Sequence, residues 1–101
     1  MGASIQEYML RTYERMMETG KPASIISSRR DLVELCYAVG DLGSVSGDDG
    51  KPLSRKALCD RLCDKLHLPH IKRPWSVYRR IIERKDHRLS LFYRFKKLYH
   101  D

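Results

Sequence analysis

The clearest helical pattern in the chain is Trp75-Ser76-Val77-Tyr78-Arg79-Arg80-Ile81-Ile82-Glu83-Arg84-Lys85. At about 100° per residue, its apolar side chains occupy one half of the helical wheel, namely Trp75, Val77, Tyr78, Ile81 and Ile82. The other half is polar and mainly basic, with Ser76, Arg79, Arg80, Glu83 and Arg84. The pattern predicts an amphipathic helix whose apolar face packs on a core and whose basic face meets solvent.

Two helices are predicted in the first half of the chain. The first begins at a capping box, in which Ser4 and Glu7 satisfy each other's free backbone N–H groups, and it ends at Gly20. The second begins at the cap Ser28 and runs as far as Gly40, because glycine favours the position that follows a helix end. Its apolar stripe consists of Leu32, Val33, Leu35, Cys36 and Val39.

Two further helices are predicted around the basic one. Ser54 is the expected cap of a helix that reaches about His67. The last helix is expected to cover about Arg88–Tyr99. Its inward side chains are predicted to be Leu91, Phe92, Phe95, Leu98 and Tyr99, and its outward ones Ser90, Arg94 and Lys97. Tyr93 lies nearest the basic side and is the aromatic ring expected to be most exposed.

A long loop is predicted near residues 41–53, where Gly, Ser and Asp replace the helical periodicity. Neither side of this loop carries enough apolar residues to build a core alone. The 101 residues are therefore expected to form a single all-α domain, a small bundle of four or five helices.

Charge divides the chain into two unlike halves. Residues 1–50 hold five Lys or Arg against eight Asp or Glu, a net charge of −3. Residues 51–101 hold fifteen against five, a net charge of +10, so that the two halves sum to +7. Such a concentrated positive field attracts polyanions before any specific contact forms. Nucleic acid is the candidate partner, because neutralising its phosphates releases counterions and favours binding.

The predicted nucleic-acid-binding residues lie in the C-terminal third. They are Lys72, Arg73, Arg79, Arg80, Arg84, Lys85, Arg88, Arg94, Lys96 and Lys97, and Arg55 and Lys56 extend the set. If the last two helices pack through their apolar faces, these side chains form one continuous basic surface. The predicted helix over 75–85 has neither Asn nor Gln, the residues that read adenine, so we expect contacts with the phosphate backbone and little sequence specificity.

The segment from Leu53 to Ile82 resembles a SAP-like helix–extended loop–helix module, of the kind seen in small proteins of large DNA viruses. The resemblance rests on a Ser-capped helix with a Leu-rich face, a proline-containing extended link and a second helix preceded by basic residues. It implies DNA binding, favoured over RNA, through Lys72, Arg73, Arg79 and Arg80. The segment departs from the family's pattern because His67 stands where that pattern has glycine before the turn, the turn glycine is missing and the first helix is one residue longer.

An alternative function is that of a structural or adaptor subunit in a larger assembly, such as a virion or a ribonucleoprotein. The basic half would then dock on an acidic protein surface. The partner can also be a second copy, because the acidic half of one chain complements the basic half of another.

The sequence shows no arrangement typical of catalysis. It has no glycine-rich phosphate loop and no pair of carboxylates in an apolar setting, so we expect no enzyme and no cofactor. A zinc site is not expected either: Cys59 and His67 are separated by about 12 Å along a helix, whereas zinc ligands lie about 2.0–2.3 Å from the metal. Cys59 and Cys63 are predicted to be buried structural thiols instead.

The cellular setting follows from the thiols and the hydropathy. Three cysteines without a disulfide spacing pattern indicate a reducing, intracellular compartment: the cytoplasm, the nucleus or a virion. No apolar run approaches the roughly 20 residues that cross a bilayer, so no membrane partner is expected.

Overall fold

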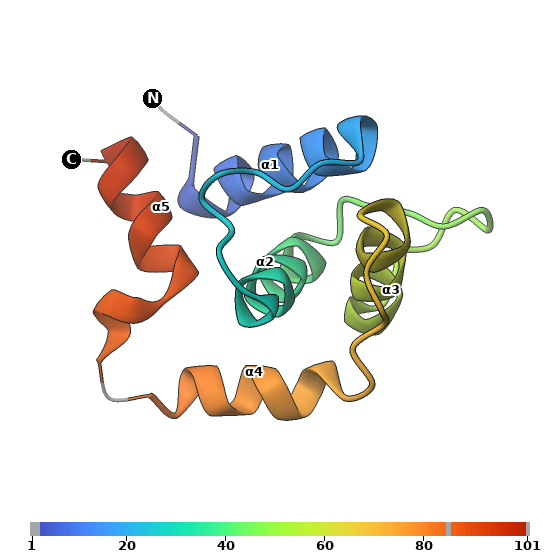
Figure 1. The fold of residues 1–101 in the computed structure, drawn as a ribbon. Coiled ribbons are helices and arrows are strands. Elements are labelled where there is room, and N and C mark those ends of the chain that lie inside the picture. Colours follow the sequence, from blue (N-terminus) through green and yellow to red (C-terminus); the bar gives the residue numbers. More distant parts are fainter. Residues whose placement is uncertain (1–2, 85, 101) are drawn as a thin grey trace.

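The computed structural model describes residues 3–84 and 86–100, and this part of the chain is all-α as predicted (Figure 1). Its helices are α1 (Ile5–Thr19), α2 (Arg29–Leu42), α3 (Arg55–Lys65), α4 (Pro74–Ile82) and α5 (Leu91–His100). A short 3₁₀ helix, η1 (His87–Leu89), precedes α5. The described residues contain no β-strand, and the long loop after α2 carries only an isolated bridge between Ser46 and Pro52.

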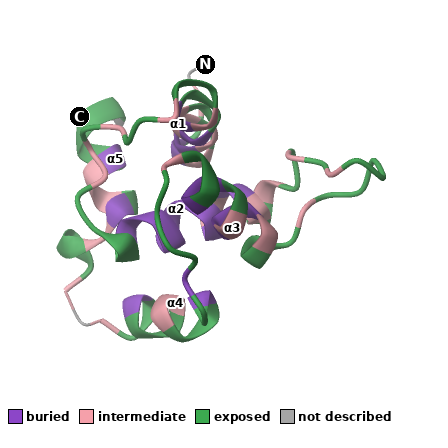
Figure 2. Ribbon diagram, turned by 45° about the vertical axis from the view of Figure 1, so that its right-hand side comes forward, coloured by how far each residue is buried: buried purple, intermediate pink, exposed green. Residues whose placement is uncertain are grey.

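Helix α2 lies at the centre of the molecule, and the other four helices surround it. Figure 1 shows α1 above it, α3 to its right, α4 below and α5 to its left. The purple colour of α2 in Figure 2 reflects the burial of its middle part, residues 31–37 and 39. The predicted apolar stripe is confirmed, and burial also includes Asp31, Glu34 and Tyr37. A helix buried on several sides forms the core of a small domain.

Three of the predicted helix starts are confirmed by their caps. The hydroxyl groups of Ser4, Ser28 and Ser54 each accept a hydrogen bond from the backbone N–H three residues later. The predicted end of α2 at Gly40 is wrong, because α2 continues to Leu42 and Gly43 ends it with φ 64°. Gly40 has another role: a Cβ atom there would stand 2.8 Å from Cγ of Arg55. Glycine therefore permits the close approach of α3.

The main core is built by α1, α2, α3 and α5. The methionines Met9 and Met16 are fully buried in it. The hydroxyl group of Tyr13 donates a hydrogen bond to the backbone oxygen of Leu58, at 3.0 Å, and so ties α1 to α3. The three free thiols are buried, as predicted for two of them, and they belong to Cys36, Cys59 and Cys63.

A second, smaller cluster holds α4 on α2. Ile71, in the link after α3, is buried together with Val33, Tyr37 and Cys63. The ring of Tyr78 on α4 stacks on Tyr37 with 4.1 Å between centroids. Because α2 covers only one narrow side of α4, the predicted inward orientation of Trp75 and Ile82 is wrong: they are 57% and 51% exposed.

The start of α5 is held by a carboxylate from α2. The two oxygens of Glu34 accept hydrogen bonds from the N–H groups of Leu91 and Phe92, at 3.0 and 2.8 Å. A negative charge is favourable at a helix N-terminus. The predicted helix over about Arg88–Tyr99 therefore begins later, at Leu91.

The predicted inward face of α5 is only partly correct. Leu91 and Phe95 are fully buried, but exposed positions are found for Phe92, Leu98 and Tyr99. Tyr93 is half-buried and is not the most exposed ring, because Trp75 is more exposed. In the part of the chain that the structure describes, no helix has the length and apolar character needed to cross a membrane.

Candidate nucleic-acid interface

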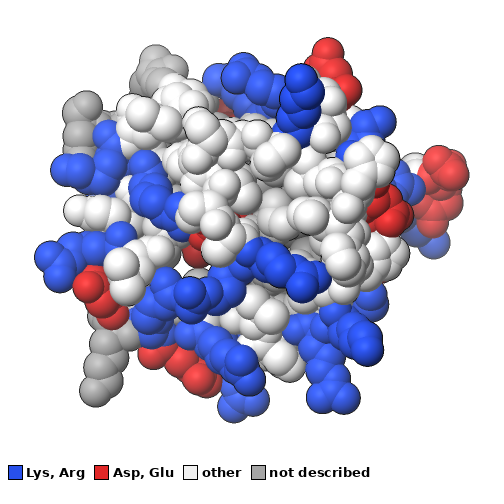
Figure 3. Space-filling view, viewed as in Figure 1, with Lys and Arg blue, Asp and Glu red and all other residues white. Residues whose placement is uncertain are grey.

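Several basic side chains around α4 make no hydrogen bond or ion pair within the described residues. In the predicted set they are Lys72, Arg73 and Arg80, all exposed. Figure 3 shows that Lys and Arg side chains cover much of the lower part of this side of the molecule, over α4 and near the start of α2. We call this set the basic face, and it consists of the half-buried Arg84 and the exposed Arg30, Lys72, Arg73, Arg79, Arg80 and Arg88.

Two carboxylates lie within the basic face, and each binds one arginine. Oε1 of Glu83 accepts a hydrogen bond from Nε of Arg79, at 3.1 Å. Oδ1 of Asp86 accepts one from Nε of Arg88, at 3.0 Å, and this bond lowers the pKa of Asp86 and raises the pKa of Arg88. Such exposed pairs are weak and exchange readily with other partners. The two arginines remain accessible to an incoming anion.

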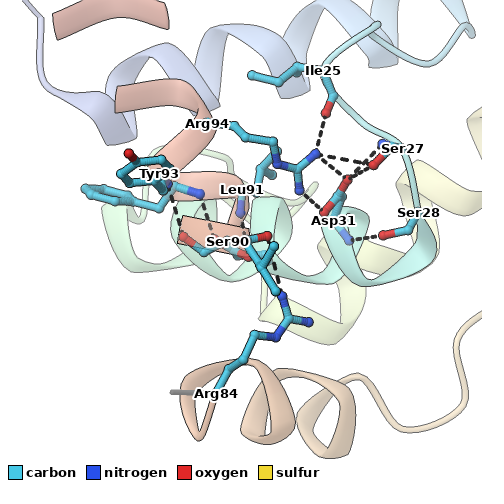
Figure 4. Close-up of polar contacts among 12 residues, drawn as sticks. Ile25, Ser27, Ser28, Asp31, Arg84, Ser90, Leu91, Tyr93 and Arg94 are labelled. Carbon is cyan, nitrogen blue, oxygen red and sulfur yellow. Dashed lines mark hydrogen bonds and ion pairs between the residues drawn. The ribbon is translucent and has the colours of Figure 1, made fainter. Parts of the chain in front are cut away.

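Arg94 occupies a different place from the one predicted. Instead of pointing outward, its guanidinium reaches from α5 to Asp31 at the start of α2 and binds both carboxylate oxygens (Figure 4). It also donates to the backbone oxygen of Ile25, at 3.0 Å, and to the hydroxyl of Ser27, at 3.3 Å. The predicted outward orientation of Arg94 is therefore wrong, and its guanidinium is engaged within the protein.

The charge on Asp31 is stabilised by this arrangement. Burial raises the pKa of Asp31, but hydrogen bonds from Arg94 and Ser27 have the opposite effect and together outweigh it. The pKa of Asp31 therefore lies below its ordinary value, and the carboxylate is ionised at neutral pH. The ion pair joins the acidic half of the chain to the basic half of the same chain.

A cleft of about 550 Å³ lies beside this ion pair. It lies between the start of α2 on one side and the end of α4, η1 and α5 on the other. Four arginines line it, and they are Arg30, Arg84, Arg88 and Arg94. The condition set for one continuous basic surface, that the last two helices pack on each other, is not met: α4 packs on α2, and α5 packs on α1 and α2. Their basic residues flank a cleft.

Arg30 was not among the predicted residues, because it belongs to the half of the chain with a net negative charge. A signal was present: Ser28-Arg29-Arg30 matches Ser54-Arg55-Lys56, a basic pair after a helix cap. In the stretch Ser28-Arg29-Arg30, Arg29 donates a hydrogen bond to the backbone oxygen of Pro69, at 3.1 Å. This bond ties the α3–α4 link to α2. Arg30 extends the basic face beyond α4.

The remaining predicted residues are dispersed. Arg55 pairs with Asp41, and Lys56 pairs with Asp60 at 3.0 Å, so the proposed extension of the basic surface carries its own counter-charges. Lys96 and Lys97 are exposed on α5. Lys85 lies outside the described residues.

Within the described part of the chain, no group of three or more His, Cys, Asp or Glu side chains is arranged to hold a metal ion. The pKa of the Cys36 thiol is well above its ordinary value, through its hydrogen bond with Cys59 and its burial. Burial likewise raises the pKa of Cys63. Both thiols are therefore protonated at neutral pH.

Comparison with family models, with curated proteins and with solved structures found no match to this chain.

Proposed function

We propose that this protein binds nucleic acid and is not an enzyme. The basic face contacts the phosphate backbone, with DNA favoured over RNA and little dependence on base sequence. The observation that carries the proposal is the group of exposed basic side chains Lys72, Arg73 and Arg80, on and before α4, which make no hydrogen bond or ion pair within the described residues. Unpaired cations repel one another, and a polyanion relieves that repulsion.

The fold supports the proposal by leaving α4 accessible. Helix α4 packs on α2 along one side, so Ser76, Arg79 and Arg80 point away from the core. Helix α4 has no Asn or Gln. It therefore offers charge to phosphates and lacks the amides that read adenine in the major groove. Binding directed to the backbone follows from that composition.

The α3–α4 region also supports the proposed relation to SAP-like modules. Helix α3 is followed by an extended link and then by α4, with Lys72 and Arg73 directly before the second helix. His67 stands where that family's pattern has glycine, and it adopts the left-handed conformation, φ 58°, that glycine favours. We infer DNA binding near the start of α4 from this arrangement.

Fluorescence anisotropy of labelled duplex DNA, single-stranded DNA and duplex RNA tests the proposed function. Binding is expected to weaken steeply between about 50 and 200 mM salt, because each neutralised phosphate of a duplex contributes about −0.9 to the log–log slope. We expect duplex DNA to bind more tightly than duplex RNA. Absence of binding to all three ligands at the lowest salt concentration would overturn the proposal.

A second candidate is the adaptor function, and the exposed apolar side chains favour it. Ile82 on α4 and Phe92 on α5 are exposed and line a groove of about 360 Å³. In this case the protein docks on an acidic protein with an apolar patch. Self-association through opposite halves is less favoured, because Asp31 and Asp41 already bind arginines of the basic half of their own chain. A monomeric mass at low salt is expected, and a concentration-dependent oligomer would favour the adaptor.

A further inference from the structure

The cleft beside the Asp31–Arg94 ion pair has an excess of positive charge. Its acidic side chains are Asp31 and Glu34, and both are nearly buried. Asp31 is bound by Arg94, and Glu34 is bound by the backbone N–H groups at the start of α5. The four arginines that line the cleft therefore outnumber its two carboxylates.

Two of those arginines are available to a ligand. Arg30 is exposed and makes no hydrogen bond or ion pair within the described residues. Among the described residues, the side chain of Arg84 makes one polar contact, a long bond of 3.4 Å from Nη1 to the backbone oxygen of Leu89. Figure 4 shows Arg84 extending from α4 toward Ser90, directly before α5. Arginine holds a phosphate through two parallel charge-assisted hydrogen bonds.

The start of α2 adds two uncharged features that favour an anion in the cleft, a hydroxyl group and a helix dipole. The oxygen of Ser28 accepts the capping bond from the N–H of Asp31. Its hydroxyl group donates no hydrogen bond to any of the described residues, and its proton is therefore available to a ligand. The fourteen-residue helix also directs the positive end of its dipole toward this side. Helix dipole, hydroxyl and guanidinium groups therefore favour the same kind of ligand.

We propose that the cleft between the start of α2, the end of α4 and η1 is a phosphate-binding site with Arg30 and Arg84 as its main ligands. This deepens the nucleic-acid-binding function proposed above and rests on it for the source of the phosphate. The phosphate comes from the end of a strand or from the backbone. The cleft volume of about 550 Å³ leaves room for the attached sugar.

The first test uses the full chain and inorganic phosphate, followed by amide NMR. Phosphate replaces chloride at constant ionic strength. We expect saturable shifts at residues 27–31 and 86–90, and their loss in the double variant Arg30→Gln, Arg84→Gln. Shifts that do not saturate, or that survive unchanged in the double variant, would overturn the site.

A matched control separates a specific site from the general positive field. The double variant Arg15→Gln, Lys65→Gln removes the same charge from two exposed side chains that make no hydrogen bond or ion pair within the described residues. We expect the cleft variant to bind DNA about tenfold more weakly than wild type, because it loses charge-assisted hydrogen bonds. The control variant is expected to change by less than about twofold, as exposed distant charges do. Equal losses in both variants would count against the site.

Two oligonucleotides of about 12 nucleotides, one with and one without a 5′-phosphate, show whether the phosphate bound in the cleft comes from the end of a strand or from the backbone. If the phosphorylated one binds more tightly and the cleft variant abolishes the difference, the cleft holds a strand end. If both bind equally and the cleft variant weakens both, it holds a backbone phosphate. Either result supports the site. If no oligonucleotide binds but inorganic phosphate still shifts the cleft amides, the proposed function fails and the phosphate site stands.

Discussion

The carboxylate of Asp31, on α2, binds the guanidinium of Arg94, on α5, through both of its oxygens. The two residues are 63 positions apart, and Asp31 is only 5% exposed. This ion pair fixes α5 against the start of α2, and the cleft with its arginines lies alongside. The geometry of the candidate site therefore depends on a contact between the two halves of the chain.

Replacing Arg94 by Ala is expected to destabilise the protein by about 2–3 kcal/mol, because it leaves Asp31 buried with only Ser27 to bind it. The loss should be smaller than the 3–5 kcal/mol typical of fully buried pairs, since the Arg94 side chain is 32% exposed. Chemical unfolding measures the difference. Lys96→Ala, at an exposed position of the same helix, is the control, with an expected change within about 0.5 kcal/mol. Similar stabilities for the two variants would contradict the assigned role.

Low pH should decrease the free energy of unfolding by protonating Asp31 of the same ion pair. The pKa of Asp31 is lower in the folded protein than its ordinary value. A depressed folded pKa adds stability that is present above the unfolded value, about 3.9, and is lost as the pH falls toward the folded value. We expect stability to fall below about pH 4, with a shallower fall in Asp31→Asn. Urea unfolding at a series of pH values provides the comparison, and parallel curves for the two proteins would refute the prediction.

His67 has an unfavourable backbone conformation, φ 58°. This region costs most residues about 1–2 kcal/mol, and glycine avoids the cost. The greater freedom of glycine in the unfolded chain offsets about 0.4–1 kcal/mol of that gain. We therefore expect His67→Gly to stabilise the protein by about 0.5–1 kcal/mol. Thermal unfolding compares it with His67→Ala, which keeps the strained conformation and should show no gain.

Trp75 is the chain's one tryptophan, so its fluorescence reports a single position. Because its side chain is largely exposed, we expect emission and acrylamide quenching close to those of free tryptophan. Trp75→Ala should cost less than about 1 kcal/mol, whereas Phe95→Ala, in the core, should cost about 3–5 kcal/mol. A blue-shifted, protected spectrum would mean that Trp75 is covered, as its place on the helical wheel first indicated.

Local signals predicted most of the helical architecture. Ser4, Ser28 and Ser54 are caps that act through hydrogen bonds over three residues, so sequence alone locates them. The end of α2 was misplaced because Gly40 serves a contact with Arg55 from a distant helix. Periodicity within one helix carries no information about such a neighbour.

The wrong predictions around the candidate site also arise because the pattern within one helix carries no information about its neighbours in the fold. A helical wheel assigns a face to each residue but does not show how much of that face a neighbour covers, so Trp75 was predicted to be buried. Arg94 was predicted to point outward, and its long side chain instead reaches Asp31. Arg30 was missed because net charge was counted along the sequence, whereas the fold brings the start of α2 beside the end of α4.

The most direct test of the central claim is charge reversal on the basic face. The variant Lys72→Glu, Arg73→Glu, Arg80→Glu changes three exposed side chains that have no polar partner in the part of the chain that the structure describes. The control, Arg15→Glu, Lys21→Glu, Lys65→Glu, makes the same change in net charge on α1 and at the ends of α1 and α3, on the far side of α2 from α4 (Figure 1).

Circular dichroism should first show that both variants remain folded. Anisotropy titration with duplex DNA at several salt concentrations then gives the affinity and the salt slope of each variant. We expect the basic-face variant to lose affinity and the magnitude of its log–log salt slope to fall by about 2–3, because three phosphate contacts are lost. The control should keep most of its affinity and its slope. Equal affinities and slopes for the two variants would contradict the account.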